Sequence, residues 1–220
     1  LEQCASHPKE TLMQFLANTT SPYVRVARIS MIEKGLDIEP TIVDPWADDA
    51  RLRAANAATR VPTLVLADGT PLAESMMIVN WLEATRAAPV HESLFGPAAG
   101  MEGVLSRSGI ALGVIDAAVH TIIIRKVTAP VLFDETPVGL RRRRTMAEGM
   151  ERLEASAAAS PMAADGIPRL DAICAITAID YLDFRFTDAP WLPPMPALRA
   201  LSQRLRARPS FAKTMPYVAA

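Results

Sequence analysis

The sequence predicts an α/β domain with a mixed sheet, followed by an all-α helical-bundle domain. Over the first 86 residues, short apolar runs bounded by turn residues alternate with patterns of helical spacing. A stretch with two prolines and two glycines follows at residues 87–100. Beyond it, apolar residues recur with helical spacing in segments too long for strands. We therefore expect domains at residues 11–86 and 101–216, joined by a linker at residues 87–100.

The first strand and helix follow from local signals. Residues 12–17 form a short apolar run that fits a buried strand, and turn residues follow it. Ser21 is a natural N-cap, and Pro22 falls at the first helical position, where its missing N–H costs nothing. An apolar helical face continues to Gly35, a residue typical of helix ends. A strand and then a helix are therefore expected before residue 36.

The next two elements are a strand at residues 38–43 and a short helix at residues 48–56. Pro62 then opens an apolar strand. Because proline cannot donate a hydrogen bond to a sheet, it fits the first residue of a strand.

Asp68 and Gly69 predict a hairpin turn, and the return strand at residues 71–73 leads into a helix at residues 75–85. The resulting order, βαβαββα, is that of a thioredoxin-like domain.

The end of this domain also has residues suited to gripping a peptide. If the Val61-Pro62 bond is cis, the Val61 N–H and C=O turn away from the sheet and can bind an extended backbone. Ser75 and the free N–H groups of the following helix would form an anion site, whereas Glu74 suits an ammonium group. A ligand with both an α-carboxylate and an α-amine would satisfy this pair.

The run Val-Pro-Thr-Leu at residues 61–64, followed by Asp-Gly and Glu-Ser, resembles the glutathione-binding half of the bacterial cytosolic glutathione S-transferases. The resemblance implies that Val61, before a cis Pro62, binds the cysteinyl backbone of glutathione. It also implies that Glu74 and Ser75 hold the γ-glutamyl end. The alternative is that Pro62 is an ordinary trans strand-opener and that Glu74 and Ser75 only cap a helix.

We place the catalytic role at Ser21. A hydroxyl at a helix N-terminus can donate a hydrogen bond to a bound thiolate, while nearby N–H groups stabilise its charge. By resemblance, Ser21 stands where thiol-using relatives have cysteine, which favours conjugation or glutathione-dependent isomerisation over disulfide chemistry. Thr19 and Thr20 are rival hydroxyl donors that spacing alone does not exclude.

The second domain is expected to contain five helices, at residues 101–127, 137–159, 170–184, 196–207 and 210–214. The resemblance extends over residues 11–216, and Asp171 matches a structural aspartate that reaches back to satisfy N–H groups at the start of the buried helix. Pro168 stands where the family usually has a Ser or Thr cap. We expect this departure to cost about 0.5 to 2 kcal/mol unless another group substitutes.

Composition excludes several classes of function. The net charge of −1 gives no reason to expect nucleic acid binding, and the four arginines at residues 141–144 spread around a helix rather than forming one face. The two cysteines, Cys4 and Cys174, are far apart, so we expect neither a disulfide nor a metal framework. The three histidines lack partners at ligand spacing, so no metal is expected.

No apolar run approaches the roughly 18 to 20 residues that span a membrane. The N-terminal residues include charged side chains where a signal peptide would have its apolar core. We therefore expect a cytoplasmic protein without a membrane partner.

The resemblance implies a glutathione S-transferase that activates the glutathione thiolate for attack on a small hydrophobic electrophile, as in detoxification. Glutathione would be the co-substrate, and the family likeness implies a homodimer. The alternative is a transferase-like binding or regulatory protein with little turnover. The sequence leaves the electrophile open, as well as the choice between conjugation, isomerisation and peroxide reduction. His120 could line the electrophile pocket or could simply pack against its apolar neighbours.

Overall fold

The computed structural model describes residues 12–86, 91–130, 132–159 and 162–218. The chain divides into two compact units, one formed by the residues up to Glu92 together with those from Thr214 onward, and the other by Ser93–Lys213. Cys4, His7 and the first part of the predicted linker lie outside the described residues.

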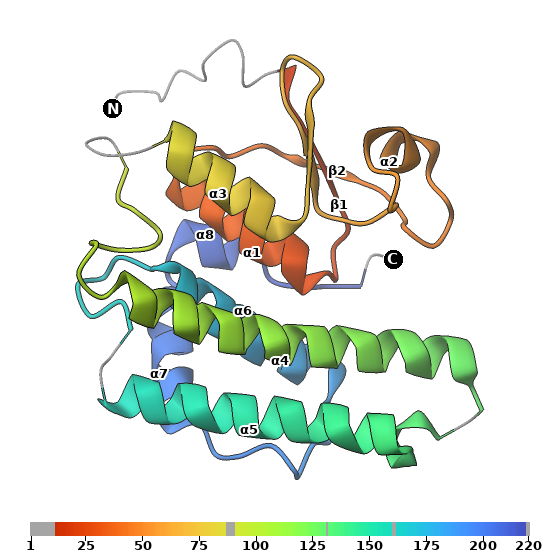
Figure 1. Cartoon of the computed structure of the whole chain (residues 1–220), viewed down its shortest axis with the longest axis vertical. Coiled ribbons are helices and arrows are strands. Elements are labelled where there is room, and N and C mark those ends of the chain that lie inside the picture. The colour runs from red at the N-terminus through yellow and green to blue at the C-terminus, as the bar shows by residue number, and fades with distance from the viewer. Residues whose placement is uncertain (1–11, 87–90, 131, 160–161, 219–220) are drawn as a thin grey trace. The chain divides into compact units, whose positions relative to one another are not determined.

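In its described residues, the first unit contains a four-stranded sheet and three α-helices (Figure 1). In chain order these are β1 (Gln14–Ala17), α1 (Pro22–Glu33), β2 (Pro40–Ile42), α2 (Ala50–Ala55), β3 (Thr63–Val65), β4 (Pro71–Ala73) and α3 (Ser75–Thr85). The predicted βαβαββα order is therefore confirmed. The hairpin turn between β3 and β4 is closed by two hydrogen bonds, from the N–H of Leu66 to the carbonyl of Thr70 and from the N–H of Gly69 to the carbonyl of Leu66, both 2.9 Å.

The strands lie in the order β2-β1-β3-β4. β1 is parallel to β2, with Ala17 opposite Ile42. β3 is antiparallel to both β1 and β4, with Thr63 opposite Leu16 on one side and Ala73 on the other. The carboxyl ends of β1, β2 and β4 therefore meet the amino end of β3 at one end of the sheet. The loop after β1, the loop before β3 and the start of α3 after β4 therefore all lie at this end of the sheet.

Helices cover both faces of the sheet. Because side chains alternate along a strand, Phe15 and Ala17 of β1 point to one face and Leu16 to the other. On the first face they pack with buried residues of α1 and α3, which lie side by side (Figure 1). On the second face, Leu16 packs with Val43 and with Leu52 of α2.

α1 and α3 are joined at their far ends by a buried lysine. Lys34, the C-cap of α1, is fully buried, and its Nζ lies 2.6 Å from Glu83 Oε1. The same Nζ donates to the carbonyl of Arg86 at 3.1 Å. Gly35 follows with φ of +70°, a conformation that favours glycine at helix ends. This ionic contact fixes the two helices against each other at the end opposite their N-termini.

The second unit is helical, as predicted (Figure 1). Its elements are α4 (Met101–Thr128), the short 3₁₀ helix η2 (Phe133–Glu135), α5 (Pro137–Ala159), α6 (Leu170–Arg185), α7 (Pro196–Leu205) and α8 (Pro209–Ala212). α6 is buried on all sides from Leu170 to Leu182 and packs mainly on α4. It is the central helix of this unit, in agreement with its continuous apolar sequence.

The start of α6 differs from the expected capping arrangement. Arg169 is the N-cap and makes no side-chain capping bond. Asp171, which is 2% exposed, accepts from the N–H of its neighbour Ala172 at 2.8 Å and from Arg107 Nε of α4 at 2.8 Å. The ion pair with Arg107 therefore compensates the charge of the buried Asp171 carboxylate, at a helix start that lacks the usual Ser or Thr cap.

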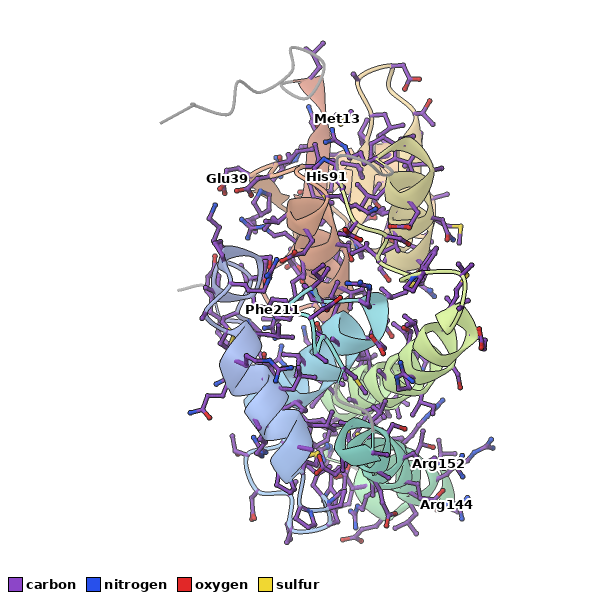
Figure 2. All side chains as sticks on the ribbon, turned by 90° about the vertical axis from the view of Figure 1, so that its left-hand side faces the viewer. Met13, Glu39, His91, Arg144, Arg152 and Phe211 are labelled. Atoms are coloured by element: carbon purple, nitrogen blue, oxygen red, sulfur yellow. The ribbon has the colours of Figure 1, made fainter. Side chains whose placement is uncertain are left out.

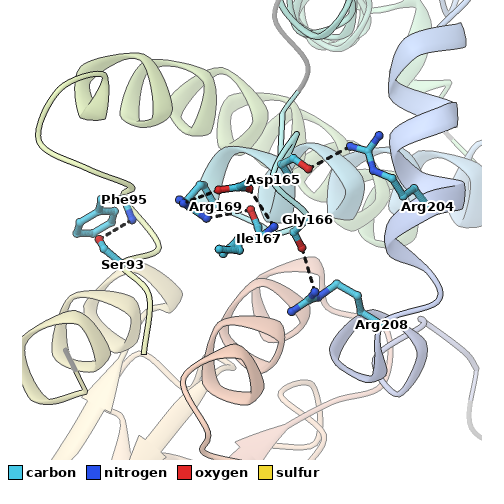
Figure 3. A network of polar contacts seen from close by, with 9 residues as sticks. Ser93, Phe95, Asp165, Gly166, Ile167, Arg169, Arg204 and Arg208 are labelled. Carbon is cyan, nitrogen blue, oxygen red and sulfur yellow. Dashed lines mark hydrogen bonds and ion pairs between the residues drawn. The ribbon is translucent and has the colours of Figure 1, made fainter. Parts of the chain in front are cut away.

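Two arginines, one in the last turn of α7 and one just after this helix, hold the loop that precedes α6 (Figure 3). Arg204 donates to the carbonyl of Met162 and Arg208 to the carbonyl of Gly166, both at 3.0 Å. Within the loop, Arg169 bonds Asp165 at 3.0 Å. These contacts fix the entry of the chain into α6.

The arginine-rich part of α5 is solvated only in part. Arg141 and Arg144 are exposed, whereas Arg142 and Arg143 are half-buried and the Arg143 guanidinium lies 6.0 Å from the centre of the Trp191 ring. Arg144 pairs with Glu148 at 3.9 Å, and both side chains are more than half exposed. Figure 2 shows Arg144 and Arg152 on the outer side of α5. Such an exposed pair contributes little to stability.

Among the residues described, no helix combines the length and the apolar character that a membrane crossing requires. In the same part of the chain, no three side chains of His, Cys, Asp or Glu gather in a way that could hold a metal ion.

Candidate functional site

The five predicted site residues lie at one end of the sheet in the first unit. Ser21 follows the carboxyl end of β1 after a short turn. Val61 and Pro62 directly precede β3, and Glu74 and Ser75 directly follow β4. Since the sheet register brings these three strand ends together, the three segments emerge at the same end of the sheet. Residues 21, 61 and 74 are far apart in sequence, so only the sheet order brings them to one place.

Ser21 is the N-cap of α1, as predicted. Its Oγ accepts a hydrogen bond from the N–H of Val24 at 3.3 Å, and its own N–H donates to Asn18 Oδ1 at 2.9 Å. The hydroxyl therefore acts as an acceptor toward the helix and keeps its proton for donation to another group. Ser21 is half-buried, so a ligand can reach it.

Thr19 and Thr20, the rival hydroxyl donors, occupy the turn before Ser21. Both are half-buried, so burial does not distinguish them from Ser21. The carbonyl of Thr19 accepts a hydrogen bond from the N–H of Tyr217 at 3.2 Å. What sets Ser21 apart is its place at the N-terminus of α1, where the helix dipole favours negative charge.

The Val61-Pro62 peptide bond is cis. Val61 lies just outside the sheet ladder, whose register begins at Thr63, and its side chain packs against the core. The preceding turn is fixed by two polar side chains that are almost fully buried, Asn56 and Thr63. Both donate to the carbonyl of Arg60, at 3.0 and 2.9 Å. Asn56 and Thr63 therefore position the backbone of Val61, a role that the sequence analysis did not identify.

Glu74, rather than Ser75, is the N-cap of α3. Its backbone has φ of +74°, a left-handed conformation that costs a residue other than glycine on the order of 1 to 3 kcal/mol. Its carbonyl accepts from the N–H groups of Met77 and Ile78, both at 3.2 Å. The N–H groups of Ser75 and Met76 stand at the helix start, where no helical acceptor exists for them.

The side chains of this pair differ in exposure. Ser75 is 3% exposed at the first position of α3, while the Glu74 side chain is 58% exposed. Arg60 Nη1 lies 3.7 Å from Glu74 Oε1. An exposed carboxylate beside unpaired helix N–H groups can hold an ammonium group and a carboxylate of one ligand at the same time.

The N-termini of α1 and α3 point to the same end of the sheet, because each helix directly follows a strand that ends there. Both contribute partial positive charge to this region. The site thus combines a hydroxyl donor at Ser21, backbone groups at Val61, the carboxylate of Glu74 and the N–H groups at the start of α3. This set is suited to a peptide-like ligand with a nucleophilic anion.

The protein does not supply a thiol from its described residues. Cys174 is free and fully buried in α6, and burial raises the pKa of its thiol well above the usual range. Cys174 is therefore not a nucleophile, and Cys4 lies outside the described residues.

Comparison with known proteins agrees with this geometry. Residues 20–85, which include all five predicted site residues, match the N-terminal domain of glutathione S-transferase. The whole structure is similar to a glutathione S-transferase of Methylobacterium radiotolerans in complex with glutathione sulfonate. That similarity has 30% identity and a TM-score of 0.84 and covers 94% of this chain and 96% of the other. The chain belongs to the glutathione S-transferase family.

Two other known proteins are similar to this chain over nearly its whole length. A glutathione transferase of Pseudomonas fluorescens Pf-5 with bound glutathione is 26% identical, with a TM-score of 0.78, and covers 94% of this chain and 100% of the other. The GST-like protein YibF of Escherichia coli K12, described as uncharacterized, is 28% identical over 206 residues, which are 93% of this chain and 98% of YibF.

The chain has one further contact beside Ser21 that the sequence did not reveal. Residue 214 was expected to end the last helix, but α8 ends at Ala212 and the following segment lies against the first turn of α1. Arg25 Nε donates to Thr214 Oγ1 at 3.4 Å, and the N–H of Tyr217 donates to the carbonyl of Thr19. No local pattern signals a contact between positions 189 residues apart.

Proposed function

We propose that this protein is an active glutathione S-transferase in which Ser21 stabilises the glutathione thiolate. The observation that carries the proposal is the hydrogen-bonding state of Ser21. The Ser21 Oγ accepts a hydrogen bond from the N–H of Val24, so the hydroxyl proton is available for donation to a ligand. The thiolate would lie at the N-terminus of α1, where the helix dipole also stabilises negative charge.

The magnitude of this effect is sufficient for catalysis. A free thiol with a pKa of roughly 8.5 is about 3% ionised at pH 7, and lowering the pKa by ~2 units takes roughly 2.7 kcal/mol. One hydrogen bond to a charged group contributes about 1.5 to 3 kcal/mol, and the helix terminus adds about 0.3 to 1 kcal/mol. Together these contributions account for a bound glutathione that is mostly ionised at neutral pH.

The remaining site residues would hold the tripeptide. The backbone of Val61, positioned by Pro62 and by the buried pair Asn56 and Thr63, binds the cysteinyl backbone. Ser75 and the N–H groups at the start of α3 bind the α-carboxylate of the γ-glutamyl end. Glu74 binds its α-ammonium group. Family membership and the glutathione bound to the P. fluorescens relative support this assignment.

In the proposed reaction, the glutathione thiol first loses its proton to solvent. The thiolate sulfur then attacks an electrophilic carbon and forms a C–S bond, while a leaving group such as halide departs with its bonding electrons. We infer from family membership that the electrophile is small and hydrophobic, that the protein acts as a cytoplasmic homodimer, and that detoxification is its role. Neither a metal nor a second cofactor takes part in this scheme.

The test combines binding and turnover. The purified protein should be retained on glutathione-agarose and should conjugate glutathione to 1-chloro-2,4-dinitrobenzene. Ser21→Ala should reduce the conjugation rate roughly 10- to 100-fold, corresponding to the ~1.5 to 3 kcal/mol bond. Thr20→Ala, in the same turn, is the matched control and should retain most activity.

Other outcomes have defined meanings. Retention on glutathione-agarose without conjugation across a panel of electrophiles would favour a binding or regulatory protein. A Ser21→Ala variant with full activity would move the catalytic role to Thr20, Thr19 or the backbone N–H groups.

A further inference from the structure

The segment Thr214–Val218 runs beside the turn that contains Ser21. Although it follows the helices of the second unit, it belongs to the first compact unit. Figure 1 shows this last described part of the chain alongside the start of α1. The N–H of Tyr217 donates to the carbonyl of Thr19 at 3.2 Å, two residues before Ser21. The backbone of Tyr217 is therefore in direct contact with the turn that bears the proposed catalytic hydroxyl.

A buried arginine anchors the same segment to α1. Arg25, which is 4% exposed, donates from Nε to Thr214 Oγ1 at 3.4 Å and from Nη2 to Met215 Sδ at 3.3 Å. Arg25 lies in the first turn of α1, one turn after Ser21. With the Tyr217 contact, the segment is held at three points around the N-terminus of this helix.

Apart from Thr214, which is buried, the side chains of the segment lie outside the core. Tyr217 is 58% exposed, Met215 38% and Val218 71%. A fixed backbone that presents apolar and aromatic side chains to solvent next to a reactive centre is ready to contact a ligand. Because the backbone is already ordered, such a contact costs little additional conformational entropy.

We propose that this segment forms a wall of the electrophile site and that Tyr217 is a specificity-determining residue for aromatic electrophiles. The inference rests on the proposed function, because it requires the glutathione sulfur to lie beside Ser21. An aromatic group attached to that sulfur would then lie against the Tyr217 ring. Stacked or edge-to-face contacts between two rings favour aromatic over aliphatic groups.

The experiment measures binding rather than turnover, so that it does not depend on catalysis. Calorimetry compares glutathione with S-(4-nitrobenzyl)glutathione, which carries an aromatic group on the same sulfur. In Tyr217→Ala we expect the Kd of the S-(4-nitrobenzyl) compound to rise about three- to tenfold, the range of one aromatic contact. The Kd of glutathione should stay the same. Tyr217→Phe should bind both compounds like the wild type, because the ring and not the hydroxyl makes the contact.

Two further variants serve as controls. Val138→Ala truncates an exposed apolar side chain of α5, outside the segment, and should change neither affinity. Tyr217→Pro removes the ring and also the N–H that binds Thr19. It should weaken the binding of S-(4-nitrobenzyl)glutathione more than Tyr217→Ala does, since it also removes a hydrogen bond that holds the segment in place.

The outcomes separate this inference from the proposed function. If wild type binds glutathione but Tyr217→Ala leaves the affinity for S-(4-nitrobenzyl)glutathione unchanged, or weakens both compounds equally, the role of Tyr217 is wrong and the proposed function stands. If wild type binds neither compound, the proposed function is wrong and this inference with it.

Discussion

Ser21 Oγ lies 3.3 Å from the backbone nitrogen of Val24 and accepts its hydrogen bond. One side chain thereby caps α1 and keeps a proton available at the N-terminus of the same helix. Capping and thiolate stabilisation use different atoms of the hydroxyl group, its oxygen lone pair and its proton. Substitutions can therefore separate the two roles.

Ser21→Asp should separate them most clearly. Aspartate accepts the Val24 hydrogen bond as well as serine does, so the free energy of unfolding should stay within about 0.5 kcal/mol of wild type. Its carboxylate cannot donate to a thiolate and repels it, so conjugation should fall at least as far as in Ser21→Ala. Ser21→Ala should in addition lose about 1 kcal/mol of stability. Urea unfolding and initial rates measure the two properties, and a Ser21→Asp variant with full activity would refute the role of the hydroxyl.

Glu74→Gln should weaken glutathione binding without affecting the fold. The side chain is 58% exposed, so the loss of its charge should raise the Kd of glutathione only about two- to fivefold. The left-handed backbone of residue 74 is retained, and the melting temperature should not change. Asp68→Asn, which removes an exposed charge from the hairpin turn at the other end of β4, is the matched control. An equal effect of both variants would indicate general electrostatics instead of a specific contact.

Lys34→Met should strongly destabilise the first unit. It leaves Glu83, whose side chain is only 14% exposed, without the ammonium group 2.6 Å away, and removal of one partner of a buried pair costs about 3 to 5 kcal/mol. The double variant Lys34→Met/Glu83→Leu should recover much of this loss, since it removes both charges. Arg53→Ala breaks the exposed pair with Asp48 and should cost less than about 1 kcal/mol. Chemical denaturation compares the three, and no recovery in the double variant would contradict the buried-pair explanation.

Stability should depend on pH through His91. Burial, followed by the nearby positive charges of Arg86 and Lys34, lowers the pKa of this imidazole below its ordinary value of 6.5. The unfolded chain therefore takes up the proton first as pH falls. The contribution of His91 to stability is present above pH 6.5 and is lost as pH decreases below it. His91→Gln should flatten this part of the stability profile between about pH 7.5 and 5.5, and a variant with the same slope as wild type would show that another group is responsible.

Much of the fold could be predicted because local signals bound its elements. Helical spacing predicts helices at residues 75–85 and 137–159, and α3 and α5 have these bounds. Serine and proline in succession predict the start of α1 at Pro22, which the structure confirms. Strand β2 is shorter than the predicted residues 38–43, because pairing with β1 involves only Pro40–Ile42.

The contacts between distant residues could not be predicted in the same way. Asp171 was expected to satisfy N–H groups at the start of α6, and it accepts from the N–H of Ala172. Its ion-pair partner Arg107, in contrast, is 64 positions away and is unrelated to any local pattern. The anchoring of Thr214 by Arg25 is of the same kind. In the candidate site, the sequence indicates which residues carry the chemistry, whereas the supporting contacts of Asn56 with the turn before Val61 depend on the packed structure.

The most direct test of the central claim is a pH titration of the thiolate absorbance of glutathione bound to the wild type and to Ser21→Thr and Ser21→Ala. In the wild type and in Ser21→Thr, which keeps the hydroxyl, we expect the pKa of the bound thiol to lie ~2 units below the free value of roughly 8.5. In Ser21→Ala it should return by about 1 to 2 units toward that value. An unchanged pKa in Ser21→Ala, or a wild-type pKa near that of free glutathione, would contradict the stabilisation of the thiolate by Ser21.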